Sequence, residues 1–148
     1  MKYSIGLLKP DCLKRGIEKE ILAMIRNSGF IIIEKRRVRL TREDVDTIWN
    51  SCKKTYFYED MVKFFLSEDC IIFIVEGENA ILRLNELVGY FEPALADSGT
   101  IRNIYGISAM ENIIHSTLNE ETYLKELFLF FGLSAVTRKR RGMMVEYV

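Results

Sequence analysis

The stretch that most constrains the fold is "DCIIFIV", residues 69–75, where an unbroken apolar run follows a single acidic residue. A short run of β-branched and aromatic residues without internal charge is typical of a buried strand. Gly77 ends this run, and the pattern that follows predicts a helix at residues 80–88 that Gly89 terminates. The chain must therefore build a sheet around this strand and cover the sheet with helices.

The rest of the chain predicts strands and helices in alternation. Strands are expected at residues 3–8, 30–40 and 113–116, and helices at residues 13–25, 41–49 and 59–65, with a last helix after residue 119. Thr41 and Asn119 are suited to cap the helices that they precede. Residues 91–103 contain Pro93 and Gly99 without periodicity, which predicts a long loop with a few helical turns.

The order of these elements predicts an α+β fold. Strand, helix, strand, helices, strand, helix, strand and helix correspond to a ferredoxin-like βαββαβ sandwich, in which helices pack on a four-stranded antiparallel sheet. The 148 residues contain no internal repeat, linker or shift in composition. We therefore expect a single domain over residues 1–148.

Charge and cysteine content exclude several classes of function. The 21 basic and 21 acidic residues balance, so no overall field attracts nucleic acid or an anionic membrane. The three cysteines form no Cys-x-x-Cys pair, which argues against a disulfide framework or a zinc site and favours a cytoplasmic protein. No segment has the length of a signal peptide or a membrane span. The basic run "TRKRRG", residues 137–142, is more typical of a solvated or subunit-facing tail than of a nucleic-acid site.

The candidate chemistry centres on His115, the only histidine of the chain. Glycine-rich phosphate loops and metalloprotease or hydrolase motifs are absent from the sequence, so phosphates would have to be bound by side chains. Lys9, Arg102 and Asn112 are the candidates for that role. Glu126 in the final helix is the acid that could hold the imidazole, directly or through a hydroxyl.

Imidazole is a plausible phosphoryl acceptor because it is substantially neutral, and hence nucleophilic, at pH 7. Lys9 and Arg102 would neutralise charge on a transferring phosphoryl group. Taken singly, each of these residues is more often structural or solvated than functional. Phe57 is likewise more often a core residue than a platform for a nucleotide base. Periodicity alone therefore indicates only a soluble α+β domain.

Three motifs in order resemble the landmarks of the nucleoside diphosphate kinase family. "KPDCLKRG" follows the first strand, "GTIR" lies in the long loop, and "NIIHST" surrounds the only histidine. The register between them holds without gaps from Lys9 to Glu126. The resemblance implies a ping-pong transfer of the γ-phosphoryl group from a nucleoside triphosphate to a nucleoside diphosphate, with Mg²⁺ carried by the phosphates and not by protein ligands.

The resemblance also implies a role for each site residue. His115 would be the phosphorylated nucleophile and Glu126 would orient its ring. Lys9 and Asn112 match residues that contact the sugar hydroxyl and terminal phosphate, and Arg102 matches an arginine on the phosphates. Phe57 matches the aromatic residue that stacks on the base, which would leave the enzyme indifferent to base identity. A homo-oligomer is implied as well.

Several positions depart from the family pattern. Asn85 stands where an arginine usually binds the β-phosphate, and Phe91 where a threonine donates to the same phosphate. Trp49 replaces a tyrosine, and Ser116 replaces the glycine after the histidine. These changes motivate an alternative, a catalytically weak or inactive nucleotide-binding or scaffold module on the same fold.

An RNA-binding sheet domain is a third hypothesis, because RNA-recognition modules share the same order of elements. It requires paired exposed aromatic residues on a central strand, and "DCIIFIV" does not supply them.

Overall fold

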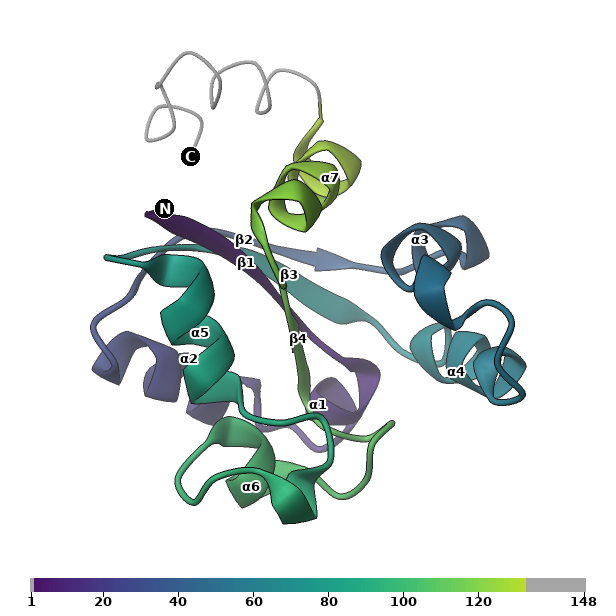
Figure 1. Ribbon diagram of the computed structural model, residues 1–148, viewed down its shortest axis with the longest axis horizontal. Helices are drawn as coiled ribbons and strands as arrows, with labels where there is room; N and C mark the ends of the chain where they lie inside the picture. The colour runs from purple at the N-terminus through teal and green to yellow at the C-terminus, as the bar shows by residue number, and fades with distance from the viewer. Residues whose placement is uncertain (1, 133–148) are drawn as a thin grey trace.

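The computed structural model describes residues 2–132, and its centre is a four-stranded antiparallel sheet in the order β2-β3-β1-β4 (Figure 1). The strands are β1 (Tyr3–Leu8), β2 (Ile31–Val38), β3 (Cys70–Glu76) and β4 (Ile114–Ser116). This arrangement confirms the predicted ferredoxin-like α+β class. The basic run at residues 137–142 lies outside the described residues.

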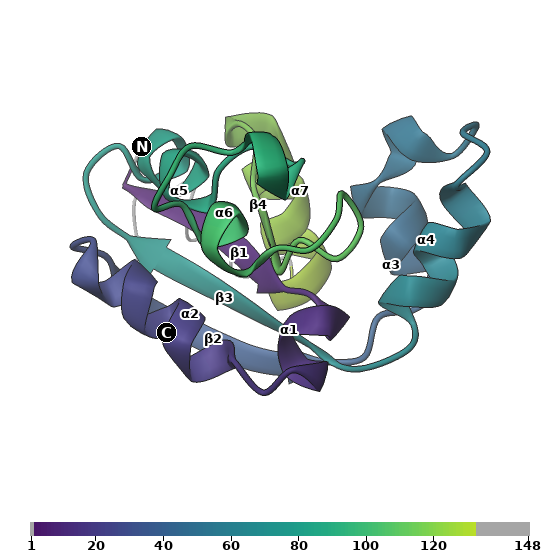
Figure 2. The same cartoon turned by 90° about the horizontal axis from the view of Figure 1, so that it is seen from below.

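The helices pack on both faces of the sheet and at one of its ends. They are α1 (Pro10–Lys14), α2 (Glu18–Asn27), α3 (Arg42–Ile48), α4 (Tyr58–Phe65), α5 (Ala80–Val88), α6 (Ile101–Tyr105) and α7 (Glu120–Phe131), with short 3₁₀ turns at Asn50–Cys52 and Pro93–Leu95. Helices α2 and α5 lie on one side of the sheet and α7 on the other, while α3 and α4 form a pair at one end (Figures 1 and 2). Between residues 2 and 132, no helix has the length and apolar character required to cross a membrane.

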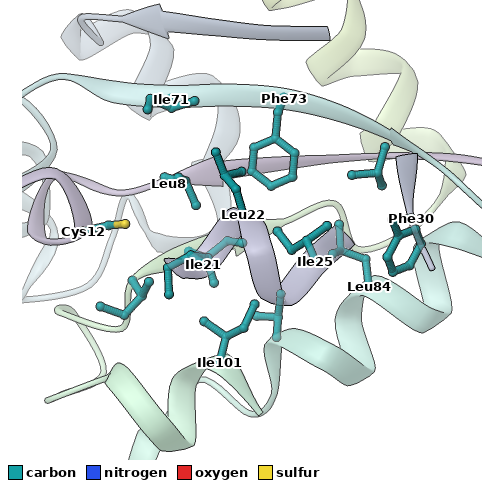
Figure 3. Close-up of a cluster of buried hydrophobic side chains, with 14 of the residues drawn as sticks. Leu8, Cys12, Ile21, Leu22, Ile25, Phe30, Ile71, Phe73, Leu84 and Ile101 are labelled. Carbon is teal, nitrogen blue, oxygen red and sulfur yellow. The ribbon is translucent and has the colours of Figure 1, made fainter. Parts of the chain in front are cut away.

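Strand β3 is covered on both faces of the sheet, and this burial explains why residues 70–75 are all apolar. Successive side chains of a strand point to opposite faces. Cys70, Ile72 and Ile74 accordingly join the core under α4 and α7, whereas Ile71 and Phe73 join the core under α2 and α5. Figure 3 shows the second of these cores, where Phe73 of the sheet faces Leu22 and Leu84 of the helices. This central strand is therefore apolar as far as Val75, and the polar Glu76 stands at its partly exposed end.

Glycine and capping residues account for the element boundaries. The helix predicted at residues 13–25 is two helices, because Gly16 has a φ of +66° and interrupts the backbone between α1 and α2. The expected caps are confirmed: Thr41 forms a capping box with Asp44, and Asn119 forms one with Thr122. The loop at residues 91–103 contains one 3₁₀ turn and the start of α6, which Thr100 caps.

A pair of leucines on α5 provides a test of this packing. Leu84 is fully buried in the core of Figure 3, whereas Leu82 is 52% exposed on the same helix. We expect Leu84→Ala to lower the free energy of unfolding by about 2–5 kcal/mol, because a cavity is added to the lost burial. Leu82→Ala should change it by no more than about 0.5 kcal/mol. Urea unfolding of both variants measures the difference, and equal losses would contradict the placement of α5.

Candidate active site

A pocket of about 590 Å³ lies where β1 ends and β4 begins, beside α4 and the loop before α6. The side chains predicted to bind nucleotide converge there, together with the candidate nucleophile. The lining residues are Lys9, Trp49, Cys52, Tyr56, Phe57, Met61, Phe65, Phe91, Glu92, Arg102, Ala109, Met110, Asn112 and His115. Glu126 and Asn85 do not line this pocket.

The sheet register brings Lys9 and His115 together. In the antiparallel pairing of β1 with β4, Leu7 lies opposite His115. The next connection beyond the strand ends is a hydrogen bond from the Lys9 backbone N–H to the Ile113 carbonyl, at 2.9 Å. Residues separated by more than one hundred positions in sequence therefore share one end of the sheet.

His115 is held by a carboxylate on its far side. Its Nε2 lies 2.9 Å from Glu126 Oε2, and the Thr117 hydroxyl donates to the other oxygen of Glu126. Glu126 is only 4% exposed. Burial by itself raises the pKa of Glu126, but the charge and hydrogen bond of His115 and the bond from Thr117 outweigh it, and the net pKa is lowered. A carboxylate on Nε2 favours the tautomer in which Nδ1 has a free lone pair.

Trp49 packs against the same imidazole. Its ring meets the His115 ring edge-on, with 5.2 Å between centroids, and stacks on Phe65 at 4.0 Å. Two sides of the imidazole are thus restrained, one by a hydrogen bond and one by an aromatic contact. The sequence predicted Glu126 but gave no functional role to Trp49 or Thr117.

Lys9 is a buried basic residue that lines the pocket. Its Nζ donates to the Met110 carbonyl and to Asn112 Oδ1, both at 2.7 Å, and lies over the ring of Phe65. Burial lowers the pKa of Lys9 to about 7, with Asp11 opposing the shift and Arg102 adding to it. The surrounding protein groups therefore offset only part of the free-energy cost of burying the Lys9 charge.

Arg102 brings a second buried cation to the pocket. Its guanidinium donates to the carbonyls of Gly89 at 2.9 Å and Ile114 at 2.6 Å, while its Nε is buried without a partner in the part of the chain that is described. Burial lowers the pKa of Arg102 to about 10. Two desolvated cations near one imidazole form an environment that favours an anion.

Aromatic residues form another part of the pocket wall. Phe57 immediately precedes α4 and contacts Tyr56 edge-on at 5.5 Å between centroids. Phe91 is 48% exposed, and its backbone carbonyl accepts a hydrogen bond from the Asn112 amide at 2.9 Å. The wall offers flat apolar surfaces suited to a planar ring.

The "KPD" motif also shapes the backbone beside His115. Pro10 begins α1, and a carboxylate oxygen of Asp11 accepts a 3.0 Å hydrogen bond from the Ile113 N–H. Ile113 has a φ of +80°, a strained conformation for a β-branched residue. Asp11 was not among the predicted site residues, although its place in the motif could have indicated it.

The position expected to carry an arginine is occupied differently. Asn85 bonds to Ser116 and Thr117 of the β4 region and lines a separate, open hollow beside Gly89 and Thr100. Arg83, two residues earlier, does not substitute for the missing cation. Its guanidinium donates to the backbone carbonyls of Glu78 and Ser28, away from the pocket.

The pKa of Lys9 predicts a pH dependence of stability. The pKa falls from 10.5 in the unfolded chain to about 7 in the folded protein, so between these values the unfolded chain binds more protons and stability rises with pH. The slope reaches about 1.4 kcal/mol per pH unit. Subtracting the unfolding free energy of Lys9→Met removes the contribution of groups that titrate alike in both proteins, such as the buried thiol of Cys12. A difference that stays flat from pH 7 to pH 10 would contradict the burial of Lys9.

Comparison with known proteins identifies the family. The model of the family "Nucleoside diphosphate kinase" matches residues 2–136. A nucleoside diphosphate kinase of Chlorobaculum tepidum is 36% identical over 138 residues, which cover 93% of this chain and 99% of the relative. One of Methanocaldococcus jannaschii is 36% identical over 124 residues, 84% of this chain and 89% of the relative.

Solved structures agree with the sequence matches. The crystal structure of nucleoside diphosphate kinase from Encephalitozoon cuniculi superposes with a TM-score of 0.86 at 28% identity, covering 90% of this chain and 91% of that one. The fold, the motifs and these matches all point the same way. This chain belongs to the nucleoside diphosphate kinase family.

Proposed function

We propose that this protein transfers the γ-phosphoryl group of a nucleoside triphosphate to a nucleoside diphosphate through a phosphohistidine at His115. The observation that carries the proposal is the imidazole itself, which pairs with Glu126 at 2.9 Å and lines a pocket containing two buried cations. Membership of the nucleoside diphosphate kinase family supports the same reaction. A neutral imidazole with one nitrogen engaged has the other available as nucleophile.

The reaction proceeds in two half-reactions of the same kind. The lone pair of His115 Nδ1 attacks the γ-phosphorus, an N–P bond forms, and the bond to the β,γ-bridging oxygen breaks as the diphosphate leaves. The ring keeps its Nε2 proton, and the Glu126 carboxylate stabilises the resulting positive charge. A terminal phosphate oxygen of the second nucleotide then attacks the same phosphorus and frees the histidine. The product of the first step leaves before the acceptor binds, which is a ping-pong mechanism.

The remaining pocket residues bind the nucleotide. We assign Lys9 and Arg102 to the phosphates, because an anion would compensate the two cations that burial has stripped of water. Asn112, held by Lys9 and by the carbonyls of Phe91 and Ala109, presents an amide beside them for the sugar or the terminal phosphate. Phe57 would stack on the base. A stacking contact alone does not distinguish one base from another.

Magnesium is the implied cofactor. Within residues 2–132, no three His, Cys, Asp or Glu side chains are grouped so that they could hold a metal ion. As the family resemblance implies, we assign Mg²⁺ to the nucleotide phosphates, with Lys9 and Arg102 as neighbouring cations. When bound, the ion neutralises phosphate charge and orients the terminal group.

Three further properties belong to this proposal. A single domain over residues 1–148 is supported by two cores that share one sheet. A cytoplasmic location is supported by three cysteines that are all free. A homo-oligomer is supported by exposed apolar side chains around the loop before α6, namely Tyr90, Phe91, Leu95, Ile104 and Ile107.

Phosphorylation of the protein tests the mechanism directly. Incubation with γ-labelled ATP and Mg²⁺ should give an acid-labile, base-stable phosphoprotein that passes its label to GDP. His115→Ala should remove the label and retain nucleotide binding, because the imidazole is the acceptor and the cations remain. Absence of label on the unmodified protein, with nucleotide still bound, would favour a binding or scaffold module instead.

The Glu126 carboxylate gives a second test. Glu126→Gln keeps the size of the side chain but removes its charge, so the imidazolium formed on phosphorylation loses its counter-ion. We expect the rate of phosphoenzyme formation to fall about ten- to a hundredfold, the equivalent of one charge-assisted hydrogen bond. Glu121→Gln, an exposed carboxylate on the same helix, is the matched control. In rapid-quench measurements, the control should form the phosphoenzyme at the rate of the unmodified protein. A Glu126→Gln enzyme that is equally fast would contradict the role assigned to Glu126.

A further inference from the structure

The Asn85 side chain joins α5 to the segment that carries the nucleophile. Its Nδ2 donates to the Thr117 carbonyl at 2.9 Å, and its Oδ1 accepts from the Ser116 hydroxyl at 2.5 Å. Ser116 and Thr117 are the two residues that follow His115. The Asn85 amide thus uses its oxygen and one of its N–H groups at the end of β4, and it has little remaining hydrogen-bonding capacity for a ligand.

The position of β4 explains why this connection matters. β4 has only three residues and lies at the edge of the sheet, where β1 is its sole strand partner among the described residues. The Thr117 N–H continues the ladder toward β1 with a 2.9 Å bond to the Ile5 carbonyl. Asn85 binds the Thr117 carbonyl, so α5 supplies a hydrogen bond to the backbone directly after this short strand.

Thr117 transmits this restraint to the imidazole. It is fully buried, its backbone is fixed by Ile5 and Asn85, and its hydroxyl donates to the Glu126 carboxylate. The same carboxylate pairs with His115 Nε2. A shift of Thr117 would therefore change the orientation of Glu126 and, with it, the nitrogen that the imidazole presents to the pocket.

We propose that Asn85 is a positioning residue for His115, acting with Ser116 to fix the end of β4, and that it is not a ligand for the nucleotide phosphates. This inference rests on the proposed function and deepens it. It also explains two departures from the family pattern as one change, because the asparagine in place of arginine accepts its hydrogen bond from the serine in place of glycine. The phosphate charge is then left to Lys9, Arg102 and the bound metal ion.

A spectroscopic test requires no nucleotide. His115 is the only histidine, so the imidazole ¹⁵N signals of the whole protein belong to it. We expect the unmodified protein to show the single tautomer with the proton on Nε2. Asn85→Ala and Ser116→Ala should each give a mixture of tautomers. Glu86→Ala, an exposed neighbour on the same helix, should match the unmodified protein.

Steady-state kinetics of the complete transfer reaction supply the second arm. Asn85→Ala removes two hydrogen bonds, whose net contribution corresponds to a rate roughly tenfold lower. We expect this loss in kcat, with an unchanged KM for the diphosphate. The Asn85→Ala, Ser116→Ala double variant should be no slower than Asn85→Ala, because the two residues act through one contact. Ser116→Ala also serves as the independent variant if Asn85→Ala fails to fold.

The experiments distinguish a failure of the positioning role of Asn85 from a failure of the proposed function. A raised KM for the diphosphate with unchanged kcat in Asn85→Ala would make Asn85 a phosphate ligand and overturn the proposal. Unchanged imidazole signals in both alanine variants would overturn it as well. An unmodified protein that forms no phosphohistidine would refute the proposed function, and the tautomer measurement would still decide whether Asn85 positions the ring.

Discussion

Strand β1 is buried along its whole length between β3 and β4, and the candidate site depends on that burial. Its register with β3 separates the two cores, because alternate side chains of both strands must face opposite helical layers. Its register with β4 places His115 beside the end at which Lys9 begins the turn into α1. A slip of one residue would send His115 to the other face, so the core packing that forbids the slip also fixes the chemistry.

The two buried basic residues show how the fold creates a pocket that favours the binding of an anion. Lys9 and Arg102 have lowered pKa values chiefly because burial removes water from both side chains; the charge of Arg102 adds to the shift of Lys9, and Asp11 opposes both shifts. Holding two such groups in one pocket costs stability, and an anion that enters the pocket offsets that cost. Binding of an anion is therefore favoured by an arrangement that costs folding stability.

The sequence predicted the local features well where a single residue decides the backbone. Thr41 and Asn119 were identifiable as caps because their side chains satisfy free N–H groups, and the apolar β3 run indicated a strand covered on both faces. The break at Gly16 was missed because the apolar residues on either side of it keep a helical spacing. Periodicity records which face is buried and does not record a left-handed residue between two helices.

The residues of the candidate site can be divided in the same way, into those that a sequence motif indicates and those that only the folded structure reveals. The sequence motifs were sufficient to predict that His115, Lys9 and Arg102 would lie in one pocket and that Glu126 would lie beside the imidazole. The parts that orient them could not be predicted, because Trp49 and Thr117 act through contacts that exist only after folding. No spacing rule relates a threonine two residues after a histidine to a carboxylate on the following helix.

The departures from the family pattern differ in what they change physically. At Phe91 the Asn112 amide binds the backbone carbonyl, so this contact depends on the path of the loop and not on the side chain. At Trp49 the side chain itself matters, because its ring packs on His115 and on Phe65. Asn85 and Ser116 matter as a pair, since each supplies what the other's hydrogen bond requires. A substitution at an active site is therefore better judged by the bond that it makes in the folded protein than by the residue that it replaces.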